Sequence, residues 1–167
     1  MTAQDFPMTV GIEAIAERVR ELQAGREDFG IAVTGSVASG KSTFARHLEQ
    51  NLKPPLTVET VSTDGFLFTT DYLRANGLFE RKGFPESYDR AAMEAAIKSV
   101  RHQATDFPAY SHVTFDPDPA LTRTIDDPDI LILEGVGFVQ RGGPSPAPHE
   151  PDILIYLDAE LEHIEGW

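Results

Sequence analysis

A chain of 167 residues with 41% hydrophobic and 25% charged side chains is long enough for one globular domain with a substantial core and too short for two ordinary ones. The 14 basic and 27 acidic side chains give a formal net charge of −13, which would repel nucleic acids and anionic membranes but not a small anion held by local N–H groups. No cysteine is present, which excludes disulfides and thiolate metal sites. Without a secretory signal or an apolar run of membrane-spanning length, we expect a cytoplasmic location.

The first predicted element is an amphipathic helix over residues 9–24. Ile12, Ile15 and Val19 recur at helical spacing, charged residues occupy the other faces, and Gly25 is suited to end the helix. We expect this helix to pack against the sheet without a chemical role.

A phosphate-binding loop is predicted next. An apolar run over residues 29–34 predicts a buried strand, and the pattern that begins near Phe44 predicts a helix to about Asn51. The string GSVASGKS, residues 35–42, stands between them with the spacing G-x-x-x-x-G-K-S. The candidate cofactor-binding residues are Gly35, Ser36, Val37, Ala38, Ser39, Gly40, Lys41, Ser42 and Thr43.

Each residue type in this loop has a physical reason. Gly35 and Gly40 allow N–H groups to approach phosphate oxygens closely, at the positive end of the following helix. Lys41, a candidate catalytic residue, adds positive charge for the β- and γ-phosphates, and Ser42 offers a hydroxyl to Mg²⁺. The alternative is a chance match, which the flanking strand and helix patterns make rare. We therefore expect ATP and Mg²⁺ as cofactors.

A second strand is predicted over residues 56–62, and it is followed by Thr63 and Asp64. The carboxyl end of a strand faces the ligand crevice of an open α/β sheet, so Asp64 is the candidate catalytic base. Residues 65–88 mix aromatic, glycine and basic residues without a sustained period, which is typical of a lid or binding loop. A cluster of aromatics packed under a loop is the alternative.

A helix capped by Asp89 is predicted next, followed by a short extended segment over residues 109–116 between prolines and acids. We expect Tyr110, His112 and Thr114 to share one face of this segment and to present polar groups to a ligand.

Residues 129–135 form a second buried-strand pattern that ends in an acid, Glu134. This is the form of a Walker B element, whose carboxylate positions Mg²⁺. A Gly/Pro-rich loop over residues 137–151, a further strand over residues 152–158 and a helix over residues 159–165 follow. The elements together predict an α/β fold of the P-loop NTPase type: one domain over residues 1–167, a three-layer sandwich with a mostly parallel central sheet flanked by helices.

Several strings, in this order, resemble the type I (bacterial-type) pantothenate kinases of the P-loop kinase superfamily. They are GSVASGKST with Ala45-Arg46, TDGFL (63–67), RKGFPESYD (81–89), YSH (110–112) and PDILILEG (128–135). The resemblance covers roughly residues 30–167, and RKGFPESYD and YSH are its most specific parts.

The resemblance implies ATP-dependent phosphorylation of the primary hydroxyl of pantothenate to 4′-phosphopantothenate, the first step toward coenzyme A. Asp64 matches the acid that accepts the proton of that hydroxyl, and Tyr110 and His112 match residues that line the pantothenate pocket. Arg46 and His112 match positions implicated in feedback binding of coenzyme A. The family is typically dimeric, which implies a homodimer.

The resemblance also assigns the phosphate and Mg²⁺ contacts to Lys41 and Ser42, and Glu134 to the end of the Walker B strand. Three features depart from the family. The segment before the first strand is shorter than usual, and Phe115 stands where a tyrosine is common. Members of the family continue past Trp167, where they carry a tyrosine, an arginine and an asparagine of the active site, so we expect a chain truncated at its C-terminus, either a fragment or a natural truncation.

Two alternatives stay open. One is a related P-loop kinase that acts on uridine or glycerate, although the RKGFPESYD string argues against it. The other is a truncated nucleotide-binding module without catalysis, which the loss of an arginine at the transferring phosphoryl group would produce.

Overall fold

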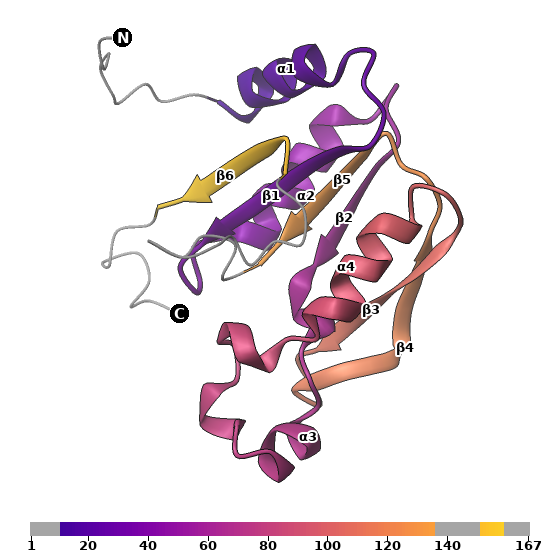
Figure 1. The fold of residues 1–167 in the computed structure, drawn as a ribbon. Coiled ribbons are helices and arrows are strands. Elements are labelled where there is room, and N and C mark those ends of the chain that lie inside the picture. The colour runs from indigo at the N-terminus through magenta and orange to yellow at the C-terminus, as the bar shows by residue number, and fades with distance from the viewer. Residues whose placement is uncertain (1–10, 136–150, 159–167) are drawn as a thin grey trace, which may run out of the picture.

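The computed structural model describes residues 11–135 and 151–158 (Figure 1). Its helices are α1 (Ile12–Gln23), α2 (Lys41–Leu52), α3 (Thr70–Ala75) and α4 (Arg90–Ser99). Its strands are β1 (Phe29–Gly35), β2 (Val58–Ser62), β3 (Thr105–Ser111), β4 (Asp116–Ile125), β5 (Ile130–Glu134) and β6 (Ile153–Leu157). Three short 3-10 turns lie between β2 and α4: η1 (Thr63–Phe66), η2 (Phe79–Arg81) and η3 (Pro85–Ser87).

A four-stranded parallel sheet with the order β2-β5-β1-β6 forms the centre of the fold. β1 and β5 coincide with apolar runs in the sequence, as strands covered on both faces require. The register pairs Glu134 of β5 with Val33 of β1 and with Ser62 of β2. The carboxyl ends of three strands therefore meet at one edge, where open α/β sheets bind ligands. The prediction of an α/β fold with a mostly parallel sheet is confirmed.

Each face of this sheet has its own core, because alternate strand residues point to opposite sides. On one face, Ile31, Val58 and Ile132 pack against α1 and α2. On the other face, Val61 and Leu131 pack against α4 and against the antiparallel hairpin formed by β3 and β4. The second layer thus combines a helix with a hairpin, which Figure 1 shows on the side of the sheet where β2 lies.

The hairpin corrects the prediction of one short extended segment over residues 109–116. β3 ends at Ser111, the next four residues turn, and β4 continues to Ile125. Two prolines, Pro117 and Pro119, lie in β4. They are tolerated because, among the strands that the structure describes, β4 pairs with β3 alone, so one of its edges needs no N–H donor.

The same turn overrides the expected alignment of side chains after Tyr110. The Ser111 hydroxyl accepts hydrogen bonds from the N–H groups of Val113 (3.3 Å) and Thr114 (3.2 Å), which bends the chain out of the strand. His112 and Thr114 therefore do not continue one strand face with Tyr110, and that prediction is wrong.

The segment between β2 and α4 contains α3 and three 3-10 turns rather than an irregular loop. Figure 1 shows it at the bottom of the molecule, past the carboxyl end of β2. The Asp89 side chain accepts a hydrogen bond from the Ala92 N–H (2.9 Å), so the predicted cap of α4 is confirmed. The predicted helix over residues 159–165 and nearly all of the predicted Gly/Pro loop lie outside the described residues. Among the helices that the structure describes, none is long and apolar enough to cross a membrane.

Candidate active site

The phosphate loop connects the end of β1 to the start of α2. β1 ends at Gly35 and α2 begins at Lys41, as the motif predicts. Glycine is required at position 35 because an added Cβ would lie 2.3 Å from the carbonyl oxygen of Leu157. Gly40 has a φ of +81°, a left-handed backbone that other residues rarely adopt. The loop therefore folds closely over the end of the sheet.

The donors of this loop fit a phosphate chain. α2 starts without a side-chain cap, so the N–H groups of its first turn have no side-chain acceptor. Lys41 Nζ donates to the Ser36 carbonyl at 2.6 Å, which holds its charge over the loop. The Ser39 hydroxyl is buried and has no hydrogen-bond partner within the described residues. Uncapped N–H groups, a positive charge and an unpartnered hydroxyl match a bound polyphosphate.

Glu134 lies at the end of β5, beside Ser62 of β2, and is 7% exposed. Burial raises its pKa above the ordinary value for a glutamate. The nearby Ser62 and Ser42 hydroxyls oppose this rise in pKa, Asp64 adds to it, and the charge of Lys41 opposes it. The carboxylate is thus close to both hydroxyls and within electrostatic reach of the other two charges.

The Ser42 hydroxyl and the Glu134 carboxylate are the oxygen ligands that Mg²⁺ prefers. Within residues 11–135 and 151–158, no group of three or more His, Asp or Glu side chains could hold a metal ion. Magnesium is commonly bound by one or two protein oxygens together with phosphates and water. The donor set therefore suits a cation that arrives with a phosphate rather than a cation held by the protein alone.

Asp64 lies in η1, directly after β2, where the sequence predicted it. Its N–H donates to the Ser62 hydroxyl (3.4 Å), and its Oδ1 accepts a hydrogen bond from the Tyr88 hydroxyl (3.1 Å). Burial lowers the pKa of Lys41, and the charges of Glu134 and Asp64 oppose that change. Two carboxylates and one ammonium group therefore form a single cluster at the edge of the sheet.

Tyr88 is a site residue that the sequence reasoning missed. Burial raises its pKa, and the negative charge of Asp64 raises it further, with smaller contributions from Glu134 and Tyr110. The signal that could have found it is the string over residues 81–89, which contains Tyr88 but says nothing of its contact with an acid 24 residues earlier.

The hairpin closes one side of this cluster. An added Cβ at Gly65 would lie 2.0 Å from the Pro108 carbonyl oxygen, so β3 touches the turn that carries Asp64. Tyr110 lies near the end of β3, and its ring meets that of His112 edge to face with the centroids 5.3 Å apart. His112 itself is exposed in the turn. Tyr110 is within electrostatic reach of Tyr88, which contacts Asp64, whereas His112 lies at the rim.

Two basic residues near the site differ in their surroundings. Lys82, which the sequence reasoning did not single out, donates to the Thr70 hydroxyl (2.9 Å) and pairs with Asp116 (3.2 Å). Its Nζ also lies 5.5 Å from the centre of the Tyr110 ring. Arg46, a predicted site residue, is exposed on α2, and its side chain makes no hydrogen bond or ion pair with the part of the chain that the structure describes.

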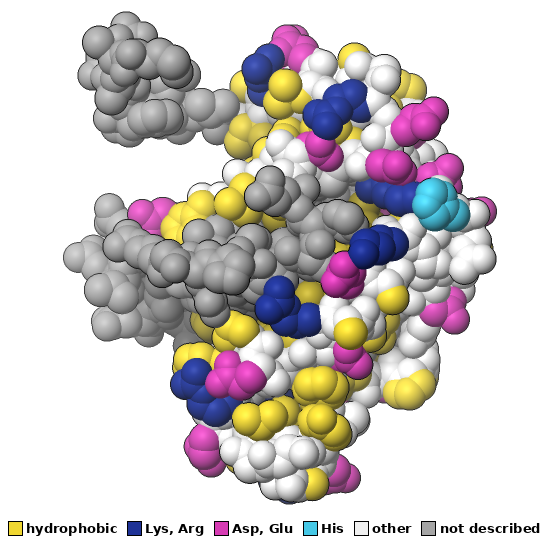
Figure 2. Space-filling model, viewed as in Figure 1, with side chains coloured by type: hydrophobic (Ala, Val, Ile, Leu, Met, Phe, Trp, Pro, Cys, Tyr) yellow, Lys and Arg dark blue, Asp and Glu magenta, His cyan; other side chains and the backbone are white. Residues whose placement is uncertain are grey.

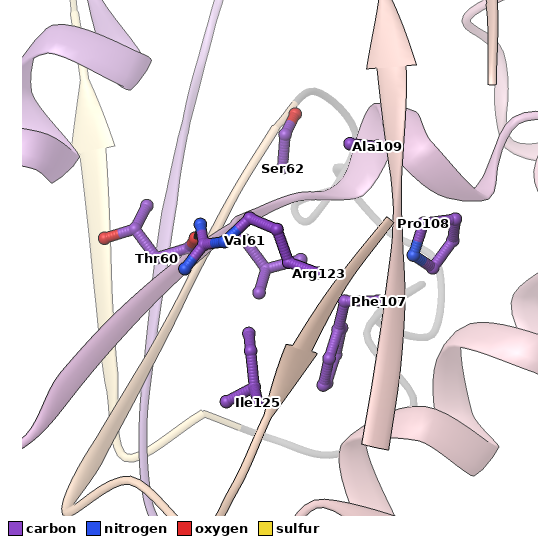
Figure 3. A pocket seen from close by; sticks show the side chains of 8 residues that line it. All are labelled: Thr60, Val61, Ser62, Phe107, Pro108, Ala109, Arg123 and Ile125. Atoms are coloured by element: carbon purple, nitrogen blue, oxygen red, sulfur yellow. Dashed lines mark hydrogen bonds between the residues drawn. The ribbon is translucent and has the colours of Figure 1, made fainter. Parts of the chain in front are cut away.

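A small cavity of about 50 Å³ lies between β2 and the hairpin (Figure 3). Its lining residues are Thr60, Val61, Ser62, Phe107, Pro108, Ala109, Arg123 and Ile125. Arg123 borders it, donates to the Thr60 carbonyl (3.3 Å) and pairs with Glu59. A space of this size holds a few water molecules at most, so we assign it to packing of the hairpin rather than to the acceptor.

The face drawn in Figure 2 carries Lys and Arg side chains scattered among Asp and Glu side chains, without a continuous basic patch. Hydrophobic side chains gather over the lower part of this view, where the segment between β2 and α4 lies. That segment exposes Tyr72, Phe79 and Phe84 at 46%, 39% and 46%. Arg74 stacks on Phe79, and Arg81 stacks on Phe84.

The parallel sheet, the glycine loop before α2 and the terminal acid of β5 define a P-loop protein of the kinase type. The phosphoribulokinase / uridine kinase family matches residues 30–164. The chain belongs to this family.

Pantothenate kinases are among its curated relatives. The chain is 44% identical to pantothenate kinase from Lactococcus lactis subsp. cremoris (strain MG1363), over 82% of this chain and 47% of the relative. It is 42% identical to pantothenate kinase from Corynebacterium aurimucosum, over 83% of this chain and 47% of the relative. The chain thus spans about half the length of the curated relatives that it matches.

The fold has solved counterparts as well. A structure from Silicibacter sp. TM1040, named for a fructose transport system kinase, superimposes with a TM-score of 0.81 at 23% identity. The alignment covers 94% of this chain and 79% of that one. At this identity the match supports the fold alone.

Proposed function

We propose that the protein transfers the γ-phosphoryl group of ATP to the primary hydroxyl of pantothenate. The observation that carries this proposal is the cluster of Lys41, Asp64 and Glu134 at the carboxyl ends of β2 and β5, beside the phosphate loop. The identity of 42–44% to pantothenate kinases supports this choice of acceptor.

ATP with Mg²⁺, when bound, supplies the phosphoryl group and neutralises the charge that develops on it. In the proposed reaction, the N–H groups of residues 35–43 and the Lys41 ammonium bind the phosphates. The Ser42 hydroxyl and the Glu134 carboxylate would hold the magnesium ion. Asp64 accepts the proton of the attacking hydroxyl.

Acceptor binding is proposed for Tyr110 and His112. Their edge-to-face contact at 5.3 Å forms a small polar and aromatic wall on the hairpin. The contact of Gly65 with Pro108 fixes this wall against the turn that carries Asp64. Such a wall can hold the acceptor while its hydroxyl faces the carboxylate.

We further propose feedback binding of coenzyme A by Arg46 and His112, whose exposure leaves both side chains accessible to an anionic ligand. A homodimer and a cytoplasmic location belong to the same proposal. Inhibition of turnover by coenzyme A, and its relief in Arg46→Ala, tests the first part. Sedimentation of the purified chain tests the dimer.

The central experiment measures ADP release by the 167-residue chain with ATP and one acceptor at a time: pantothenate, uridine or glycerate. Release that depends on pantothenate supports the proposal, whereas release with uridine or glycerate supports a related kinase. Binding of nucleotide without release supports a module that lacks catalysis.

A variant of the proposed base sharpens this test. Asp64→Asn should lower turnover by about 10² to 10⁴, with nucleotide affinity unchanged, because the carboxylate acts on the acceptor. Asp71→Asn is the matched control, since Asp71 is exposed on α3. Normal turnover in Asp64→Asn would remove Asp64 from the role of base.

A further inference from the structure

Tyr88 contacts the proposed base directly. Its hydroxyl donates to Oδ1 of Asp64 at 3.1 Å, and the residue is only partly exposed. A carboxylate has two oxygens, and this bond occupies one of them, which leaves Oδ2 for another donor. The contact thus gives the acid a defined orientation before any acceptor binds.

The backbone around Tyr88 is fixed to the chain that follows η1. The Phe68 N–H donates to the Ser87 carbonyl at 2.9 Å, and the Asp89 N–H donates to the Phe66 carbonyl at 2.7 Å. Hydrogen bonds on both sides of Tyr88 therefore place its side chain at the turn that carries the acid.

A buried serine makes this arrangement rigid. Ser87 is fully buried, its hydroxyl donates to the Phe84 carbonyl (2.7 Å), and it accepts from the Gly83 N–H (2.9 Å). These bonds close the turn just before Tyr88. The string over residues 81–89 thus forms a compact support for one tyrosine hydroxyl.

An orienting donor matters here because Asp64 has a competing partner. The charge of Lys41 is within electrostatic reach of Asp64, and attraction would draw a free carboxylate toward the ammonium group and away from the acceptor side. A hydrogen bond to a charged group is stronger than one between neutral groups, and it can hold the carboxylate in one rotamer. The raised pKa of Tyr88 keeps its hydroxyl protonated as a donor at physiological pH.

We propose that Tyr88 is a positioning residue for phosphoryl transfer: its hydroxyl holds Oδ1 of Asp64 so that Oδ2 faces the hydroxyl of the acceptor. This inference rests on the proposed function in one respect, the role of Asp64 as base. The contact itself does not depend on which acceptor is used.

The kinetic test uses Tyr88→Phe, which removes only the hydroxyl. Turnover with the acceptor should fall by about 10- to 100-fold, while the KM for ATP stays unchanged. Tyr72→Phe is the matched control, because Tyr72 is exposed on α3, stacks on Phe68 and should keep full turnover without its hydroxyl.

A double-mutant cycle separates positioning from a general structural role. In an Asp64→Ala background, Tyr88→Phe should cause no further loss of turnover, since the group through which it acts is gone. Alanine is used because an asparagine carbonyl could still accept the bond. Full turnover in Tyr88→Phe, or losses that multiply in the double variant, would overturn the proposal.

A second cycle is independent of the reaction. In the parent chain, Tyr88→Phe should lower the urea concentration at the midpoint of unfolding. In the Asp64→Ala chain, the same substitution should leave this midpoint unchanged. If the parent shows this coupling but no turnover with pantothenate, the proposed function fails while the contact stands. If the two midpoint shifts are simply additive, the contact itself is refuted.

Discussion

A single methyl group added at Gly65 should push the hairpin that carries Tyr110 away from the turn η1 that carries Asp64. Built on the present backbone, the Cβ of Gly65→Ala would lie 2.0 Å from the carbonyl oxygen and 2.6 Å from the carbonyl carbon of Pro108. Both obstructing atoms belong to the backbone, so no side-chain rotation relieves the overlap. The hairpin must move away from η1 by roughly 1 Å or more to restore ordinary contact.

This movement sets the size of the expected effect. Displacing Tyr110 by about 1 Å relative to Asp64 should lower kcat/KM for the acceptor by about 10²-fold. The overpacking should cost about 1–3 kcal/mol of stability. Nucleotide affinity should stay the same, because the phosphate loop lies between β1 and α2, whereas the three atoms nearest to the added Cβ belong to Pro108 and Ala109 of β3.

The assay is steady-state turnover with the acceptor varied at saturating ATP, together with nucleotide affinity by calorimetry. Gly77→Ala is the matched control: its φ of +68° makes alanine strained, but nothing lies within 4 Å of the added Cβ. It should lose stability, about 1–2 kcal/mol, without losing acceptor kinetics. Unchanged kcat/KM in Gly65→Ala would refute the idea that the hairpin positions the acceptor.

Two further predictions concern the charged cluster. Lys41→Ala should weaken nucleotide affinity and turnover together, because the Lys41 ammonium group binds phosphates in both the ground state and the transition state. Calorimetry measures the affinity and steady-state kinetics measures the turnover. Lys53→Ala is the control, because Lys53 is exposed. Burial raises the pKa of Glu134 in the folded chain above the value of about 4.3 that a glutamate has in an unfolded chain. Between these two pKa values the folded chain binds more protons than the unfolded chain. The free energy of unfolding therefore falls as the pH rises through this interval. Glu134→Gln should therefore have a higher urea midpoint than the parent at pH 7, a difference that closes below about pH 4, and equal midpoints at pH 7 would contradict the reasoning.

The central sheet and the phosphate loop could be predicted because their determinants are local. β1 and β5 are buried on both faces, so each is a continuous apolar run. The glycines of the loop follow a fixed spacing in the sequence, and the structure has a close contact with Leu157 at position 35 and a left-handed backbone at position 40. The start of α4 was readable for the same reason, since Asp89 caps its own helix.

The hairpin and the contact of Tyr88 with Asp64 could not be predicted in this way. Most side chains of β4 are exposed and two of its residues are prolines, so the strand has neither alternation nor an apolar run. Tyr88 reaches the acid only because backbone hydrogen bonds join two irregular segments far apart in the sequence. Both features depend on tertiary contacts, and such contacts produce no periodic pattern of apolar residues in the sequence.

In an acidic protein that binds a polyanion, positive groups close to the anion must outweigh the repulsion by acidic side chains farther away. The structure shows which groups of this chain lie close to the phosphate loop. At physiological ionic strength, exposed acids more than about 8 Å away are largely screened. What remains at the loop is the Lys41 ammonium and the N–H groups of α2, opposed by Asp64 and the buried Glu134. Neither carboxylate can be removed without loss in the proposed reaction, since one takes a proton and the other holds a cation. The net charge of −13 therefore says little about this site, whereas the balance of these three side chains decides whether a phosphate can enter it.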